Sequence, residues 1–142
     1  DFERQSLADG LAAVGFAADR PTFFLWLGVV PFLTRAAIGA TLDFVASAAS
    51  AELVFDYSEP VENYPPERRA GVDAYAARAA AAGEPWLSHF DPAAMARELR
   101  DHGLEPVEDL GFADLADRYL GPAASGRVRG PGPHVIHARR AD

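Results

Sequence analysis

The stretch PTFFLWLGVVPFLT, residues 21–34, carries the strongest structural signal in this sequence. Its apolar run is bounded by prolines, which is typical of a β-strand buried on both faces, and we expect that strand over residues 22–28. The run ends at Gly28, and Pro31 and a predicted helix follow. Because ligands of parallel α/β sheets bind at the carboxyl ends of strands, Gly28 marks a place where a ligand could approach the backbone closely.

Helical and extended patterns alternate along the first part of the chain. Ser6 and Thr34 are suitable N-caps for helices over residues 6–14 and 35–49, and residues 51–57 are predicted to form a second strand. The order helix, strand, helix, strand favours a parallel sheet with right-handed crossovers.

The second part combines an acidic, proline-rich loop with further helices and strands. Asp91 caps a helix whose first position is Pro92, and Pro106 places its strand toward the edge of the sheet. The expected elements are a loop at 58–67, helices at 68–82, 92–102 and 113–120, strands at 104–110 and 134–138, and a glycine-rich loop at 121–133. No linker divides the chain, so we expect one domain over residues 1–142.

The composition excludes several classes of protein. With 142 residues and a net charge of −8, the chain lacks the clustered positive charge that a nucleic-acid partner requires. It has no cysteine, which excludes disulfides, thiolate metal sites and cysteine nucleophiles. Its longest apolar stretch falls far short of the roughly 20 residues that span a bilayer. We expect a cytoplasmic protein that binds neither nucleic acid nor membrane.

The motifs of several common enzyme classes are missing from the sequence. It has neither a phosphate-binding glycine loop nor a Gly-x-Ser-x-Gly nucleophile elbow. No two of the four histidines have the helical i, i+4 spacing of a metal site, and His134 and His137 would face opposite sides of one strand. We therefore expect no metal ion.

Asp56 and two tryptophans are candidates for a functional site. Asp56 lies at the end of the second strand, where a carboxylate could serve as a base, but a loop-stabilising aspartate is an equally good interpretation. Trp26 lies in mid-strand, which favours core packing over stacking on a flat ligand. Trp86 lies in a connector between helices, where a pocket or lid role and a packing role are about equally supported.

Six short segments together resemble one known family. They are DFE at residues 1–3, FLWLGVVPFL at 24–33, VFDY at 54–57, GEPW at 83–86, FDP at 90–92 and VEDLG at 107–111. In this order and spacing they are similar to the carboxyl-terminal half of S-adenosylmethionine-dependent methyltransferases of the leucine carboxyl methyltransferase family. The resemblance runs from the first residue to about residue 138.

The resemblance implies a class I methyltransferase fold, whose Rossmann-like sheet has the strand order 3-2-1-4-5-7-6 with strand 7 antiparallel. The expected fold class is thus α/β, the carboxyl-terminal half of that sheet (4-5-7-6) flanked by helices. Strands 4, 5, 6 and 7 would be residues 22–28, 53–57, 104–110 and 134–138. The glycine-rich turn of the family's first half is absent, so the sequence is interpreted as a fragment, with a helical lid-like insertion at about residues 58–90.

The same resemblance implies S-adenosyl-L-methionine as the cofactor. Asp1 would accept a hydrogen bond from the adenine amino group, and Phe2 would donate its backbone N–H to the ring. The turn after strand 4 would pass the methionyl part of the cofactor. Its residues are Trp26, Leu27, Gly28 and Val29.

On the acceptor side, the resemblance implies a small-molecule or carboxylate methyl acceptor under a roof formed by residues 58–90. The pocket would be lined by Phe32, Tyr57 and Trp86. Many relatives have Glu where Leu27 stands and Tyr where Phe32 stands. Both differences remove a polar group that could bind the cofactor's ammonium group or the acceptor.

Two functions therefore stay open for this chain: part of an O-methyltransferase, or a non-catalytic half-fold that serves as an interaction module. In either case residues 22–28 would form a long apolar sheet edge. We expect this edge to pair with the missing amino-terminal half or with another chain, because such edges recruit partners or aggregate. Alone, the chain is expected to be inactive and to bind the cofactor weakly or not at all.

Overall fold

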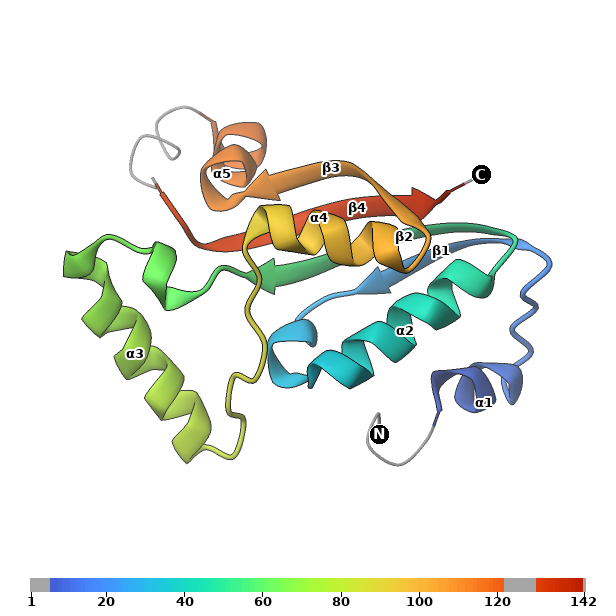
Figure 1. Cartoon of the computed structure of the whole chain (residues 1–142), viewed down its shortest axis with the longest axis horizontal. Coiled ribbons are helices and arrows are strands. Elements are labelled where there is room, and N and C mark those ends of the chain that lie inside the picture. Colours follow the sequence, from blue (N-terminus) through green and yellow to red (C-terminus); the bar gives the residue numbers. More distant parts are fainter. Residues whose placement is uncertain (1–5, 122–129, 142) are drawn as a thin grey trace.

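The computed structural model describes residues 6–121 and 130–141, so the expected adenine contacts of Asp1 and Phe2 lie outside the described residues. The described chain forms one mixed four-stranded sheet with helices around it (Figure 1). The strands are β1 (Pro21–Trp26), β2 (Ser50–Ser58), β3 (Leu104–Gly111) and β4 (Pro133–Arg140).

The strand order is β1-β2-β4-β3. β1 and β2 run parallel, whereas β4 is antiparallel to both of its neighbours, β2 and β3. This arrangement confirms the expected order 4-5-7-6 with an antiparallel strand 7. It also places β3 at an edge, as Pro106 predicted, and the register of β3 shifts between Pro106 and Glu108.

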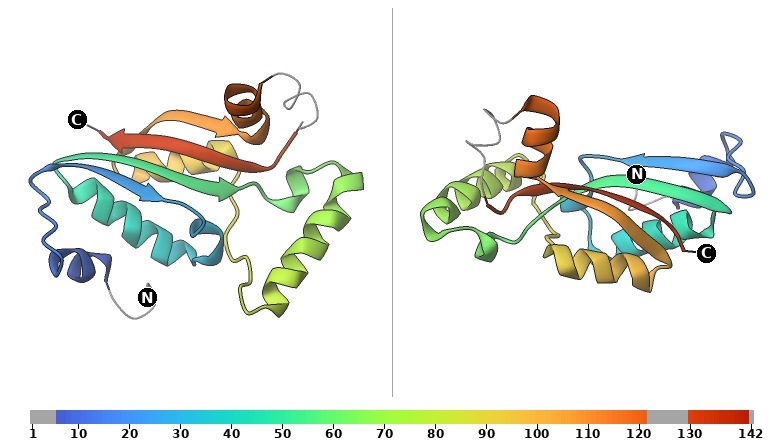
Figure 2. Two further views of the ribbon diagram at one scale, coloured as in Figure 1. Left: turned by 180° about the vertical axis from the view of Figure 1, so that it is seen from behind. Right: turned by 90° about the horizontal axis from the view of Figure 1, so that it is seen from above.

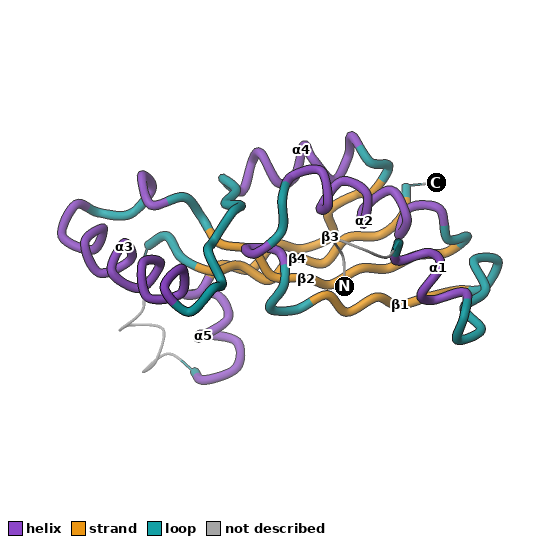
Figure 3. The backbone as a smooth tube through the Cα atoms, turned by 90° about the horizontal axis from the view of Figure 1, so that it is seen from below, coloured by secondary structure: helices purple, strands orange, loops and turns teal. Residues whose placement is uncertain are grey.

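Two helices cover one face of the sheet, α2 (Arg35–Ser47) and α4 (Pro92–Asp101) (Figure 2). Thr34 caps α2 as expected, since its Oγ1 accepts a hydrogen bond from the N–H of Ala37 at 3.2 Å. The short helix α1 (Leu7–Ala12) packs against α2, and α5 (Phe112–Leu120) lies on the opposite side of the sheet, near its carboxyl edge (Figure 3).

The core lies between the sheet and the α2–α4 layer. Alternate residues of each strand point into it, because side chains of a strand alternate between its two faces. Its fully buried large side chains come from α2, β2, α4 with the residue Phe90 before it, β3 and β4: Ile38, Leu42, Leu53, Phe55, Tyr57, Phe90, Met95, Leu99, Leu104 and Ile136.

The expectation that the strand at residues 22–28 is buried on both faces was wrong for this chain. β1 ends at Trp26, and its outward side chains Phe23 and Leu25 are 57% and 67% exposed. The reason is the one-sided helix layer: within the described residues, only α5 lies on the other face, and it does not extend over β1. β1 is also an edge strand, as expected, since it pairs only with β2 among the described residues.

The segment expected as a loop at residues 58–67 contains regular structure. A 3-10 helix, η2 (Val61–Asn63), is followed by α3 (Pro66–Ala81), which begins two residues earlier than expected. Proline is favourable at the first helical position because its missing N–H would have no partner there. α3 lies beyond the carboxyl ends of β1 and β2 (Figure 1), and none of its residues is buried.

Candidate functional site

The turn that follows β1 is held by a carboxylate of the neighbouring strand. Asp56, on β2, accepts a hydrogen bond at Oδ1 from the backbone N–H of Gly28. Gly28 has φ +71°, a conformation that favours glycine, and a Cβ built there would meet nothing within 4 Å. Its backbone is therefore open to the outside, at the carboxyl edge where ligands of such sheets bind.

This contact gives Asp56 a structural task, which agrees with its interpretation as a loop-stabilising aspartate. The same task also makes it a positioning residue for anything that binds at the turn. The neighbouring Leu27 is 53% exposed, and Val29 is half-buried against the core. The structure thus brings together Gly28 and Asp56, two candidates separated by 28 positions in the sequence.

Trp26 lies in the core, as its mid-strand position favoured. Its side chain is only 7% exposed, and its ring centroid lies 5.7 Å from that of Phe55. A ligand at the turn would therefore meet the backbone of Trp26 rather than its indole. The indole Nε1 is buried and has no hydrogen-bond partner in the described part of the chain.

The connector that carries Trp86 lies against the chain that follows the turn. The backbone N–H groups of Leu87 and Ser88 donate to the carbonyl oxygen of Pro31, at 2.7 and 3.2 Å. The hydroxyl of Ser88 donates to the carbonyl oxygen of Leu33 at 2.6 Å. These bonds bring the connector to η1 (Val30–Phe32), and so to the same edge of the sheet as the turn.

Trp86 itself belongs to a small aromatic cluster. Its ring centroid lies 5.3 Å from that of Tyr75 on α3 and 5.8 Å from that of His89. Burial lowers the pKa of His89, which favours a neutral imidazole at physiological pH. The cluster therefore presents flat, uncharged surfaces on the connector and on α3.

The remaining two pocket candidates differ in their burial. Phe32 is half-buried in η1. Tyr57 is fully buried, and its hydroxyl donates to Oδ2 of Asp109 at 2.6 Å, so its side chain is closed off from solvent in this chain. Burial and the bond to Asp109 raise the pKa of the Tyr57 hydroxyl far above its ordinary value, and it stays protonated.

Sequence reasoning missed a polar cluster at the same edge. His134, considered only as a metal ligand, lies between Asp109 and Glu59, which are 25 and 75 positions away in the sequence. No local pattern indicates such a contact, because it depends on the pairing of β4 with both β2 and β3. As expected, His134 and His137 face opposite sides of β4: His134 stacks on Tyr57, whereas His137 pairs with Glu52.

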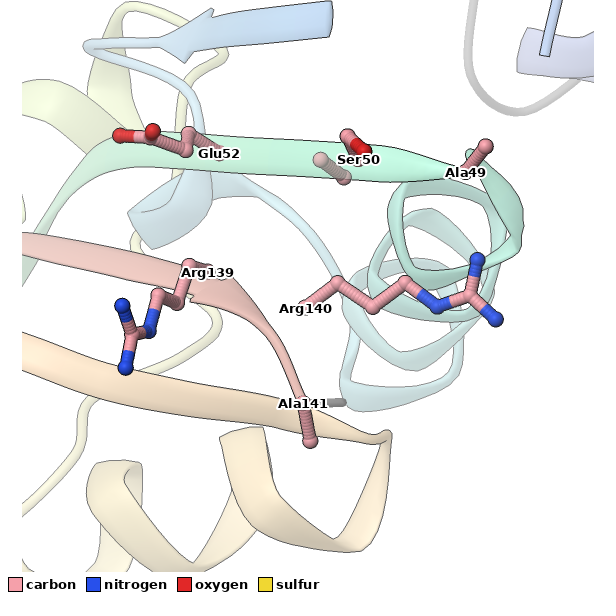
Figure 4. Close-up of a pocket in the computed structure, with 7 residues that line it drawn as sticks. Ala49, Ser50, Glu52, Arg139, Arg140 and Ala141 are labelled. Atoms are coloured by element: carbon pink, nitrogen blue, oxygen red, sulfur yellow. The ribbon is translucent and has the colours of Figure 1, made fainter. Parts of the chain in front are cut away.

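A hollow of about 400 Å³ lies at the other end of the strands from the turn (Figure 4). It lies where β2 begins and β4 ends, and Arg139 and Arg140 line it together with Glu52. Arg140 donates from Nη1 to the carbonyl oxygen of Ala48 at 3.0 Å, which ties β4 to the end of α2. This hollow contains none of the candidate residues.

Two further properties bear on the kind of protein. In residues 6–121 and 130–141, no group of three or more His, Asp or Glu side chains is arranged to hold a metal ion. No helix in the same ranges is long and apolar enough to cross a membrane.

Comparison with solved structures gives the class of fold. A Burkholderia thailandensis 1,6-didemethyltoxoflavin-N1-methyltransferase with bound S-adenosylhomocysteine is 16% identical, with a TM-score of 0.52, covering 84% of this chain and 44% of that one. Magnesium protoporphyrin IX methyltransferase from Synechocystis PCC 6803, also with bound S-adenosylhomocysteine, is 12% identical, with a TM-score of 0.51, covering 89% of this chain and 48% of that one. The pyocyanin biosynthetic protein PhzM is 14% identical, with a TM-score of 0.53, covering 94% and 38%.

These likenesses and the strand order define the fold as that of class I methyltransferases, and the chain spans less than half the length of each of these proteins. Residues 1–46 also match the family model of leucine carboxyl methyltransferase. This match confirms the resemblance to that family over residues 1–46, whereas the sequence motifs extend it to about residue 138. Comparison with curated protein sequences gives no match.

Proposed function

We propose that this chain forms the carboxyl-terminal half of an S-adenosyl-L-methionine-dependent O-methyltransferase that acts on a small-molecule or carboxylate acceptor. The observation that carries the proposal is the sheet β1-β2-β4-β3 with its single antiparallel strand, combined with an open glycine turn at the carboxyl end of β1. Two of the solved methyltransferases with this fold contain bound S-adenosylhomocysteine.

The turn after β1 fits the methionyl end of such a cofactor. Gly28 leaves the backbone uncovered, and Asp56 fixes the turn in place. When bound, the cofactor supplies an activated methyl group, so the protein's task is in-line placement and exclusion of water. A carboxylate acceptor needs no base, which agrees with Asp56 being engaged by the turn.

The acceptor would lie between this turn and the connector that carries Trp86. The connector is bonded to η1, and its flat uncharged cluster of Tyr75, Trp86 and His89 suits an aromatic or apolar acceptor body. Phe32 lies in η1 beside it. Tyr57 is buried in the core and would not contact the acceptor directly; it would support the site by its hydrogen bond to Asp109.

β1 is the place where the other half of the domain would attach. Phe23 and Leu25 expose apolar surface on an edge strand, and a parallel strand beside β1 would pair its free backbone groups. The partner of this edge is then the amino-terminal half of the same domain.

The proposal is tested on the polypeptide encoded by the complete reading frame that contains this chain. We expect transfer of a labelled methyl group from S-adenosyl-L-methionine to members of a panel of small carboxylates and phenols. We also expect the complete reading frame to encode a glycine-rich segment about a hundred residues upstream of Asp1, which is the scale of half a domain. Cofactor binding by the complete polypeptide without any transfer would contradict the catalytic part of the proposal.

The exposed edge also favours a second function, a non-catalytic interaction module. In that case the complete polypeptide would neither bind the cofactor nor transfer methyl groups, yet it would form a stable complex through β1. Replacing Leu25 with Lys should abolish such a complex, because a charge on the exposed side of an edge strand opposes association.

A further inference from the structure

A cluster of mostly buried charged side chains joins three segments at the carboxyl edge of the sheet. His134, at the start of β4, lies with Nδ1 2.9 Å from Oδ1 of Asp109 on β3 and with Nε2 3.1 Å from Oε1 of Glu59. The three side chains are 12%, 23% and 11% exposed. Such a pair of contacts places one imidazole between two carboxylates.

Glu59 is the point at which the chain leaves β2 for η2 and α3. Its Oε1 also accepts from the backbone N–H of Gly132 at 3.2 Å, and its Oε2 accepts from Nδ2 of Asn63 in η2 at 2.7 Å. The backbone N–H of Glu59 donates to the carbonyl oxygen of Gly132 at 3.2 Å. Glu59 therefore connects the exit of β2 to the chain that enters β4.

We propose that His134 is a proton-controlled tie: with a proton on both ring nitrogens it joins Asp109 to Glu59, and loss of one proton to solvent releases the Glu59 side. Each ring nitrogen faces a carboxylate oxygen, and a carboxylate only accepts hydrogen bonds. Both contacts can thus be hydrogen bonds only in the imidazolium form. In the neutral form, a nitrogen lone pair faces a carboxylate oxygen, and two negative charges share a partly buried site.

The surroundings of His134 favour the proton. Burial by itself lowers the pKa of His134, but the hydrogen bonds to Asp109 and Glu59 outweigh it and raise that pKa above its ordinary value of 6.5. The ring of Tyr57 stacks on that of His134 at a centroid distance of 4.9 Å, and its hydroxyl donates a hydrogen bond to Asp109.

Charged groups reach this site from the other elements packed around it. Asp114 of α5 and the ring of His134 both lie close to Gly111. A Cβ built on Gly111 would be 3.4 Å from Oδ2 of Asp114 and 3.5 Å from Cε1 of His134. Asp91, the N-cap of α4, lies within reach of Asn63. Arg68 of α3 brings a basic group close by, with Nη1 3.7 Å from the position that a Cβ of Gly130 would take.

His137 offers a matched comparison on the same strand. It pairs with Glu52 at 2.8 Å on the opposite face, has Glu108 opposite it on β3, and is 31% exposed. The contacts of His137 lie within the strands, whereas His134 also contacts Glu59, where the chain leaves β2 for η2 and α3.

The consequence is a pH-dependent position of the segment that leads into α3. Below the ordinary pKa the tie is closed, and it opens as pH rises through the folded-state pKa of His134. If the proposed function holds, this segment borders the acceptor site, and access of the acceptor then increases with pH over the same range.

The tie is tested by amide hydrogen exchange on the polypeptide encoded by the complete reading frame, without added cofactor, so its outcome does not depend on methyl transfer. After correction for the intrinsic pH dependence of exchange, the amides of Glu59 and Gly132 should lose protection several-fold as pH rises through the titration of His134. The variant His134→Gln should show no such step, and the control His137→Gln should keep it.

A nuclear magnetic resonance titration provides a second, independent readout. His134 should titrate above its ordinary pKa of 6.5, and Glu59→Gln should lower the pKa of His134. The tie is refuted if His134 titrates at or below 6.5, or if the exchange step at Glu59 and Gly132 is absent or persists in His134→Gln.

Discussion

The carboxylate of Asp56 accepts a hydrogen bond from the backbone N–H of Gly28, joining the carboxyl ends of β1 and β2. The donor lies in the turn where a cofactor would pass, and the acceptor lies on the neighbouring parallel strand. A side chain that looked like a candidate base is thus part of the scaffold of the turn.

Replacing Asp56 with Ala should lower the free energy of unfolding by about 1–2 kcal/mol, because the turn loses a charge-assisted hydrogen bond. Asp56→Asn keeps an acceptor oxygen and should lose less. Urea unfolding of the three proteins checks this order. Equal stability of Asp56→Ala and the unaltered chain would show that the contact contributes nothing.

Gly28→Ala should destabilise the chain by about 1–2 kcal/mol, because φ +71° is costly for a residue with a Cβ. The open space around Gly28 means that strain, not collision, causes the loss. Gly71→Ala is the matched control: Gly71 is exposed inside α3 with open space around it, so the change should stabilise by about 0.5–1 kcal/mol. Thermal unfolding of both variants should show opposite signs.

The exposed edge should make this chain associate in solution. We expect size-exclusion chromatography with light scattering to show species larger than a monomer, and Leu25→Lys to reduce them, since charge blunts an apolar edge. Val14→Lys is the control, because Val14 is 79% exposed at the end of α1, away from the sheet. A stable monomer of the unaltered chain would contradict the prediction.

The free energy of unfolding should fall as pH rises above the ordinary pKa of His134. Its pKa is raised in the folded chain, so its stabilisation is complete below 6.5 and is lost as pH rises through the folded-state value. His89 has a lowered pKa and acts in the opposite direction, with stability lost as pH falls below 6.5. Urea unfolding at a series of pH values checks this. In His134→Gln, the free energy of unfolding should depend less on pH above 6.5 than it does in the unaltered chain. An unchanged slope in that variant would assign the pH dependence to other groups.

Calorimetric titration of this chain with S-adenosyl-L-methionine should give little or no heat of binding. The turn at Gly28 offers contacts to one end of the cofactor only. Micromolar affinity would show that this half of the sheet is sufficient for binding. S-adenosylhomocysteine serves as a matched probe, because it lacks the sulfonium charge.

Local patterns in the sequence predicted most of the elements. Thr34 and Asp91 cap the helices that follow them, and the hydrogen bonds to Ala37 and Ala93 are short-range contacts that a few residues specify. The apolar run predicted the strand β1, and the family resemblance predicted its edge position. It could not predict the exposure of Phe23 and Leu25, which depends on which helices cover the other face.

The sequence by itself determined where helices and strands form and the family that their order resembles, because capping, periodicity and turn residues act over a few positions. Only the tertiary structure decided which side chains share a site. Asp56 meets Gly28, and His134 meets Glu59, only after parallel and antiparallel pairing brings distant strands into register. Strand register follows from the burial of a whole sheet face, which no short segment encodes.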